Sequence, residues 1–239
     1  MITPVNTNNK SKKNVFSSFQ NTAHTKNVYS TLYYKRNHRV EEPDWKNKAL
    51  VAGGSIIATL LPMVYFAKKQ FGKQALKNPI NLFKIDYHLK EVLALSTASI
   101  AGGAVTGIAV DKKANKKRKV QEGVFQFMNA TVPTLLVGGA LKLLEDNTKY
   151  KNSKPVKVAA IVTSLVAGMP LAAFLSNMIN DPKDKEPDRK LTLKDSIINM
   201  DDALGALVVA KVPIVEHLHL DKFMPAIFAW CGYRAGQSN

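Results

Sequence analysis

The residues best suited to chemistry lie near the C-terminal end of the sequence, where acidic side chains and histidines occur together. They are Glu216, His217, His219 and Asp221. His217 and His219 are two residues apart, so on a helix they point to nearly opposite sides and could share a metal ion only in extended backbone. We therefore expect a polar loop at a membrane edge here, with no bound metal and no cofactor.

Other sequence patterns for catalysis or nucleotide binding are missing. The sequence contains no GxGxxG, P-loop, GxSxG or HExxH pattern. Its Gly pairs at 53–54, 102–103 and 138–139 lie inside apolar runs, where no phosphate loop is expected. Asp201 and Asp202 could hold a cation or start a proton path, but they fit the polar rim of an amphipathic helix better. We expect no enzyme.

Four long apolar runs are the elements that must position the candidate polar residues. They cover residues 49–67, 92–110, 124–144 and 158–179, and the second is a charge-free stretch, VLALSTASIAGGAVTGIAV. In an α-helix this stretch rises about 28 Å, close to the thickness of a bilayer's hydrocarbon core. The pattern predicts an all-α, multi-pass helical membrane protein with four transmembrane helices.

The two ends of the sequence differ from these runs. Residues 1–44 are rich in Asn, Ser, Thr and Lys, a composition that cannot bury enough apolar surface to fold, so we predict a disordered basic tail. Residues 45–239 then form the helical membrane domain. Its C-terminal part favours an amphipathic or re-entrant region. A fifth span over 203–230 is the alternative, and it requires Lys211 to face the bundle.

Small residues recur at helical spacing inside the runs and predict how the helices pack. Lipid supplies no hydrophobic drive between helices, so close backbone approach through small side chains is what lets them associate. These stripes can serve contacts within one chain or between copies, which leaves a homo-oligomer as an alternative. The packing candidates are Gly54, Ala58, Ala98, Gly102, Gly103, Gly107, Ala160, Ser164, Gly168, Ala172 and Ser176.

The charge of the chain points to anionic partners. Thirty-four Lys and Arg against eighteen Asp and Glu give a net charge of +16, which suits phospholipid headgroups or nucleic acid. No RNA-binding motif accompanies it, so we expect the lipid bilayer and its headgroups, not nucleic acid. Segment 71–90 has the pattern of a basic amphipathic helix, either in the interface plane or packed on the bundle. The headgroup candidates are Lys73, Lys77, Lys84, Lys112, Lys113, Lys116, Lys117, Arg118 and Lys119.

Three classes of function follow. A structural or interaction protein of the membrane is favoured, because no charged residue lies in the middle of the four predicted spans. A small transporter or channel is the alternative, and an intramembrane enzyme is the third class. A cytoplasmic or inner membrane suits the chain better than an organellar one. The candidates for a polar transport path are Asn129, Thr131, Lys142, Asp202 and Lys211.

Loop charge predicts the orientation. Near the span ends, the N-terminal tail and the two segments on its side carry sixteen Lys and Arg residues, against ten on the other side. Positive residues resist translocation, so both termini should be cytoplasmic, provided that the C-terminal region does not cross. In a chain without Cys231, single cysteines near Asn115 and Asn152 should label from opposite sides with an impermeant thiol reagent. Labelling near Asn115 from outside intact cells would overturn this orientation.

Overall fold

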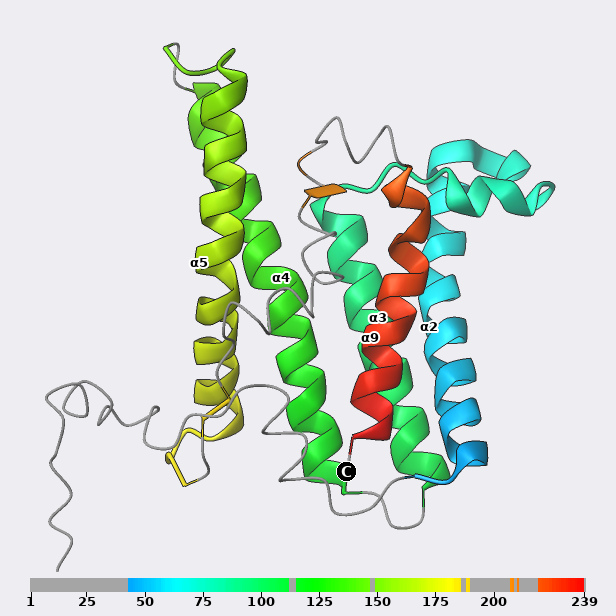
Figure 1. The fold of residues 1–239 in the computed structure, drawn as a ribbon. Coiled ribbons are helices and arrows are strands. Elements are labelled where there is room, and N and C mark those ends of the chain that lie inside the picture. The colour runs from blue at the N-terminus through cyan, green and yellow to red at the C-terminus, as the bar shows by residue number, and fades with distance from the viewer. Residues whose placement is uncertain are drawn as a thin grey trace, which may run out of the picture.

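A computed structural model describes residues 43–111, 115–146, 149–185, 188–189, 207–208, 210 and 219–238. Its regular elements are helices (Figure 1). Those long and apolar enough to cross a membrane are α2 (Trp45–Phe71), α3 (Leu89–Val110), α4 (Lys116–Asp146) and α5 (Lys154–Asn180). This confirms the predicted fold class, an α-helical multi-pass membrane protein.

The long helices extend beyond the apolar runs because polar residues cap them. The Asp44 side chain accepts a hydrogen bond from the Trp45 amide at 2.7 Å, just before α2. Before α4, the Asn115 side chain accepts one from the Arg118 amide at 3.1 Å. Side-chain caps of this kind satisfy amide groups that have no partner within the helix. The charged residues from 116 to 122 are therefore helical, although they precede the predicted span.

The segment between α2 and α3 differs from the predicted amphipathic helix. It forms two short 3-10 helices, η2 (Gly72–Leu76) and η3 (Pro79–Phe83). Gly72 ends α2 with a φ of 63°, a conformation that side chains other than glycine rarely adopt. Pro79 then starts a new turn, because it cannot continue a helix from the preceding residues. The expectation of a basic amphipathic helix in segment 71–90 is wrong, although Lys73, Lys77 and Lys84 are exposed there.

A further helix, α9 (Met224–Gln237), packs against α2 and α3 (Figure 1). Its backbone meets that of α3 at two pairs of glycines. A methyl group added to Gly103 would lie 1.9 Å from the carbonyl oxygen of Gly232. One added to Gly107 would lie 2.0 Å from the carbonyl oxygen of Gly236. The two backbones are therefore in direct contact, and only glycine fits at these crossings.

Two buried serines hydrogen-bond across the same three helices. The Ser55 hydroxyl of α2 donates to the carbonyl oxygen of Ala229 at 2.6 Å and lies 3.1 Å from the Ser99 hydroxyl of α3. Ser99 donates to the carbonyl oxygen of Phe228. These bonds satisfy hydroxyls that would otherwise be buried at a cost. They fix α9 against both neighbours at one depth in the bundle.

The predicted small residues lie at the other helix contacts. Between α2 and α3, a methyl on Gly54 would clash with Thr106, and one on Gly102 would clash with Ala58. Between α5 and α4, a methyl on Gly168 would lie 2.7 Å from the backbone of Pro133. The remaining candidates are Ala98, Ala160, Ser164, Ala172 and Ser176, of which Ser164, Ala172 and Ser176 are buried on α5. The glycines of these stripes meet helices of the same chain, whereas Ala98 and Ala160 are half-buried.

Helix α9 differs from the predicted fifth span over 203–230. It begins at Met224 and continues to Gln237, and its 14 residues rise about 21 Å, less than the 30 Å of a hydrocarbon core. Residues 203–206, 209 and 211–218 lie outside the described part, as does the basic tail up to residue 42. Gly232 and Gly236 repeat the spacing of Gly103 and Gly107, but they were not among the predicted packing residues.

The helix directions place the described ends of the chain together. In Figure 1, α2 and α4 begin at the lower end of the bundle, and α3, α5 and α9 end there. Asn115 and Asn152 are accordingly at opposite ends, since one precedes α4 and the other precedes α5. Pro43 and Ser238 share the lower end. However, α5 ends at the lower end and α9 begins at the upper end, so the condition that the C-terminal region does not cross is not met. Which side is cytoplasmic stays a prediction.

The glycine contacts predict that larger side chains at these positions destabilise the protein. Gly103→Leu and Gly168→Leu should each destabilise the bundle by about 3 kcal/mol or more, because the added side chain meets backbone that cannot yield. For a chain of this size the corresponding fall in Tm is roughly 6 to 12 °C in detergent. Val105→Leu and Val166→Leu are matched controls on the exposed faces of the same helices and should change little. Equal losses in glycine variants and controls would contradict this packing.

Candidate functional site

A stripe of polar residues runs along one face of α4 from its first turn to its middle. Lys119, Glu122, Gln126 and Asn129 follow one another at steps of three, four and three residues, which places them on one side of a helix. All four side chains are buried, three of them with no exposed surface. We call these four residues the α4 polar stripe. Buried polar groups in a membrane protein are costly and mark candidate sites.

Lys119 at the start of the stripe holds the end of α9. Its ammonium donates to the carbonyl oxygens of Gly236 at 2.8 Å and Ser238 at 3.1 Å, and lies 3.9 Å from Asp111 Oδ2. The last carbonyls of a helix have no partner within it, and they carry partial negative charge. Lys119 therefore caps α9 from outside. Its assignment to lipid headgroups is wrong, because the end of α9 covers it.

Glu122 forms a buried ion pair with Arg189, which follows α5 in sequence. Arg189 Nη1 donates to Glu122 Oε2 at 2.7 Å, and Gln126 Nε2 donates to Glu122 Oε1 at 2.6 Å. The guanidinium also lies over the ring of Phe125, 3.4 Å from its centroid. A carboxylate with two donors and a cation on an aromatic face form a strong local set of contacts.

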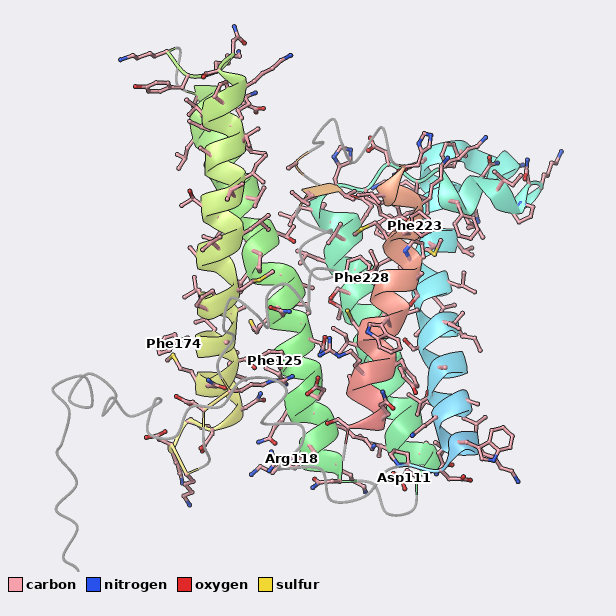
Figure 2. All side chains as sticks on the ribbon, in the orientation of Figure 1. Asp111, Arg118, Phe125, Phe174, Phe223 and Phe228 are labelled. Atoms are coloured by element: carbon pink, nitrogen blue, oxygen red, sulfur yellow. The ribbon has the colours of Figure 1, made fainter. Side chains whose placement is uncertain are left out.

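Helix α5 fixes the backbone of Arg189. The Asn177 side chain donates to the Arg189 carbonyl at 2.8 Å and accepts from the Arg189 amide at 3.2 Å. Asn180 donates to the carbonyl oxygen of Gln121 on α4 at 3.0 Å. In Figure 2, Asp111 and Arg118 mark this lower end of the bundle, and Phe125 lies next to it between α4 and α5. The ion pair is thus held from both helices.

A small cavity adjoins the ion pair. Its volume is about 40 Å³, and its lining includes Gln121, Glu122, Arg189, Ser176 and Asn180. This is room for about three waters, and the walls offer the polar partners that buried waters need. The charged side chains Glu122 and Arg189 in its lining form an ion pair with each other. The cavity therefore suits water molecules that hydrate this structural ion pair. It lies at the end of the bundle.

The predicted transport candidates do not come together. Asn129 and Thr131 are buried on α4. Lys142 is exposed and near the other end of that helix, so its assignment to an internal path is wrong. Asp202 and Lys211 lie outside the described residues. The acceptor oxygens of Gln126 and Thr131 have no hydrogen-bond partner within the described part of the chain. They lie toward the middle of α4.

The predicted headgroup residues at the lower end are only partly described. Lys116 and Lys117 are exposed, and Arg118 is half-buried. Lys112 and Lys113 lie outside the described residues. The described basic residues occupy the first turn of α4, so they stand at the edge of the membrane. Such positions suit contact with anionic headgroups.

The acidic and histidine cluster of the sequence lies at the opposite end of the bundle. His219 and Asp221 belong to the turn at η4 (Leu220–Phe223), whereas Glu216 and His217 are outside the described residues. The negative charge of Asp221 affects the hydroxyl of Tyr87, a buried residue of the loop before α3. Burial, and secondarily the charge of Asp221, raise the pKa of the Tyr87 hydroxyl well above its ordinary value.

Comparison of the chain with known protein families, curated proteins and solved structures finds no match. The geometry of the described residues therefore carries the functional argument.

The ion pair predicts an asymmetric mutational response. Glu122→Gln should lower the free energy of unfolding by about 3 kcal/mol, because Arg189 then remains buried without its counter-charge. Arg189→Met in the same chain should recover part of that loss, and thermal unfolding in detergent measures both. Lys117→Gln, on an exposed lysine of the same helix, should leave Tm unchanged. Strictly additive losses in the double variant would show that the two side chains are not coupled.

Proposed function

We propose that the protein is a structural or interaction protein of the membrane, with no enzymatic activity. The observation that carries this proposal is that the buried charged side chains bind other groups of the same chain. Lys119 binds the carbonyl groups at the end of α9, and Glu122 binds Arg189. Buried charges that are paired and hydrogen-bonded in this way hold elements in one arrangement.

The helix contacts support the same role. The backbones of Gly103 and Gly232 are in direct contact, and Gly168 packs directly against Pro133. These helix crossings therefore leave no room for a solute. A transporter works by rocking one group of helices against another around a polar site. Contacts that tolerate no added methyl group favour a fixed bundle.

The partners that we propose are the lipid bilayer and its anionic headgroups. Exposed lysines stand at both ends of the bundle, such as Lys46 and Lys117 at the lower end and Lys73, Lys77 and Lys84 at the upper end. Each lysine near an anionic surface contributes about 1 kcal/mol to binding. A second copy of the chain would have to use another surface than the glycine crossings, because these are covered. A cytoplasmic or inner membrane is the location that we propose.

A small transporter or channel is the second candidate, favoured by one observation. Gln126 Oε1 and Thr131 Oγ1 are buried acceptors without a partner among the described residues, and they lie on the middle part of α4. Buried acceptors of this kind can take a hydrogen bond from a passing solute or from water. The two candidates differ in whether these atoms are needed for a flux.

Flux measurements decide between the two candidates. The full chain in liposomes should dissipate imposed proton and potassium gradients no faster than protein-free vesicles, because its buried charges are engaged within the bundle. A flux that is several times faster, and that Gln126→Leu or Thr131→Val abolishes without unfolding the chain, would establish the transporter instead. For the interaction role, a photoreactive residue at Val162, on the exposed face of α5, should give discrete protein adducts in native membranes. Adducts with lipid alone would contradict a protein partner on this face and would leave the bilayer as the partner of α5.

A further inference from the structure

A large apolar groove runs along the outside of the bundle between α2 and α9. Its volume is about 620 Å³, within the range of sites that bind small molecules. Helix α2 lines it from Lys48 to Met63, α9 lines it from Pro225 to Tyr233, and Phe83 of η3 completes it. Ile56 and Trp230, which line it, are about half exposed, so the groove opens toward the surroundings of the bundle. We call it the α2–α9 groove.

The two ends of the groove differ in chemistry. Lys48 at the start of α2 is its charged lining residue. A methyl on Gly236 would touch Val51, and one on Gly232 would touch the Ser55 hydroxyl, so Tyr233 lies in the same half of the groove as Lys48. The rings of Trp230 and Tyr233 are 5.3 Å apart. Cationic and amphipathic aromatic side chains are the groups that favour the headgroup level of a bilayer.

The opposite end is apolar and is partly closed. Met63, Pro225 and Phe83 line it, and Phe83 comes from η3, which lies at the upper end of α2 (Figure 1). From Lys48 to Met63 the helix rises about 22 Å. One leaflet of hydrocarbon is about 15 Å thick, half of the 30 Å core. The groove can thus contain a chain that enters from the lower interface, whereas a spanning helix of a partner needs the full 30 Å and would meet Phe83.

We propose that the α2–α9 groove binds one acyl chain of an anionic phospholipid, with its phosphate beside Lys48. The apolar walls contact the acyl chain along its protein-facing side, and Lys48 supplies the charge that selects an anionic headgroup over a zwitterionic one. Small side chains at Ala52 and Ala226 provide the depth of the groove. This site does not depend on the proposed structural role, because a transporter could bind a lipid there equally well.

Tryptophan fluorescence tests the site directly. The chain has two tryptophans, so Trp45→Phe leaves Trp230, in the groove, as the sole reporter. The protein is reconstituted in phosphatidylcholine vesicles containing a minor fraction of either brominated phosphatidylglycerol or brominated phosphatidylcholine. Bromine on the acyl chain quenches Trp230 when the chain lies in the groove. We expect the anionic lipid to associate about five times more strongly, the factor that corresponds to one lysine at an anionic headgroup.

Matched variants separate a site from general surface attraction. Lys48→Gln should remove the preference for the anionic lipid, whereas Lys46→Gln, two residues away and outside the groove lining, should keep it. Ala52→Leu together with Ala226→Leu should fill the groove and weaken quenching by both lipids. Ala101→Leu, on an exposed part of α3, is the control for added bulk. Thermal unfolding of each variant confirms that it is folded.

Three outcomes would overturn the proposal. Equal quenching by the two brominated lipids would show that the groove does not select an anionic headgroup. Equal loss in Lys48→Gln and Lys46→Gln would assign the preference to the surface potential of the lower end. Absence of quenching by either lipid would show that protein covers Trp230, either a partner helix or another part of this chain.

Discussion

Helix α9 can approach α3 only because four glycines lie where the two backbones cross, and the rest of the bundle depends on that approach. In lipid the drive for helices to associate comes from close packing and hydrogen bonds, since apolar side chains are equally well solvated by acyl chains. The crossing brings Ser55 and Ser99 within reach of α9 carbonyls. It also delivers the end of α9 to Lys119. The close contact between the glycines of α3 and α9 thus sets the position of these hydrogen bonds to α9.

The length of α4 explains how a membrane helix carries buried charges. Its 31 residues rise about 46 Å, well beyond the 30 Å of a hydrocarbon core. Lys119 and Glu122 occupy its first two turns, near the lower end of the bundle, where water and headgroups are close. Each is then covered by protein, Lys119 by the end of α9 and Glu122 by Arg189. Their desolvation is offset by charge-assisted hydrogen bonds, which are shorter and stronger than neutral ones.

Local composition predicts the spans well. The predictions fail where contacts with segments distant in the sequence determine the structure. The four spans are found to within eight residues at every end, because an apolar run of bilayer length is typical of a membrane-spanning helix. The start of α4 is missed because residues 116–122 are mostly charged, and nothing local shows that α9 covers Lys119 and that Arg189 covers Glu122. The predicted helix over 71–90 fails for the opposite reason: its polar spacing is helical, but Gly72 and Pro79 interrupt the backbone.

The candidate site shows the same division. The spacing of Lys119, Glu122, Gln126 and Asn129 is visible in the sequence, yet each residue alone fits a solvated helix end or a packing contact. Their partners come from α9 and from the chain after α5, which no local pattern connects to α4. Gly232 and Gly236 were within reach of prediction, since they repeat the spacing found in α3. The apolar run around them is short, however, and a run of that length favours an interfacial or re-entrant segment over a packed helix.

The distance in sequence between α3 and α9 has a consequence for assembly. Ser99 and Phe228, which are hydrogen-bonded, are separated by 129 residues. At a synthesis rate of 5–20 residues per second, the second is made roughly 6 to 26 seconds after the first. During that interval the glycine face of α3 is in the membrane without its partner. Membrane insertion and completion of the bundle are therefore separate events, and the interval between them is when a chaperone or a wrong helix can occupy that face.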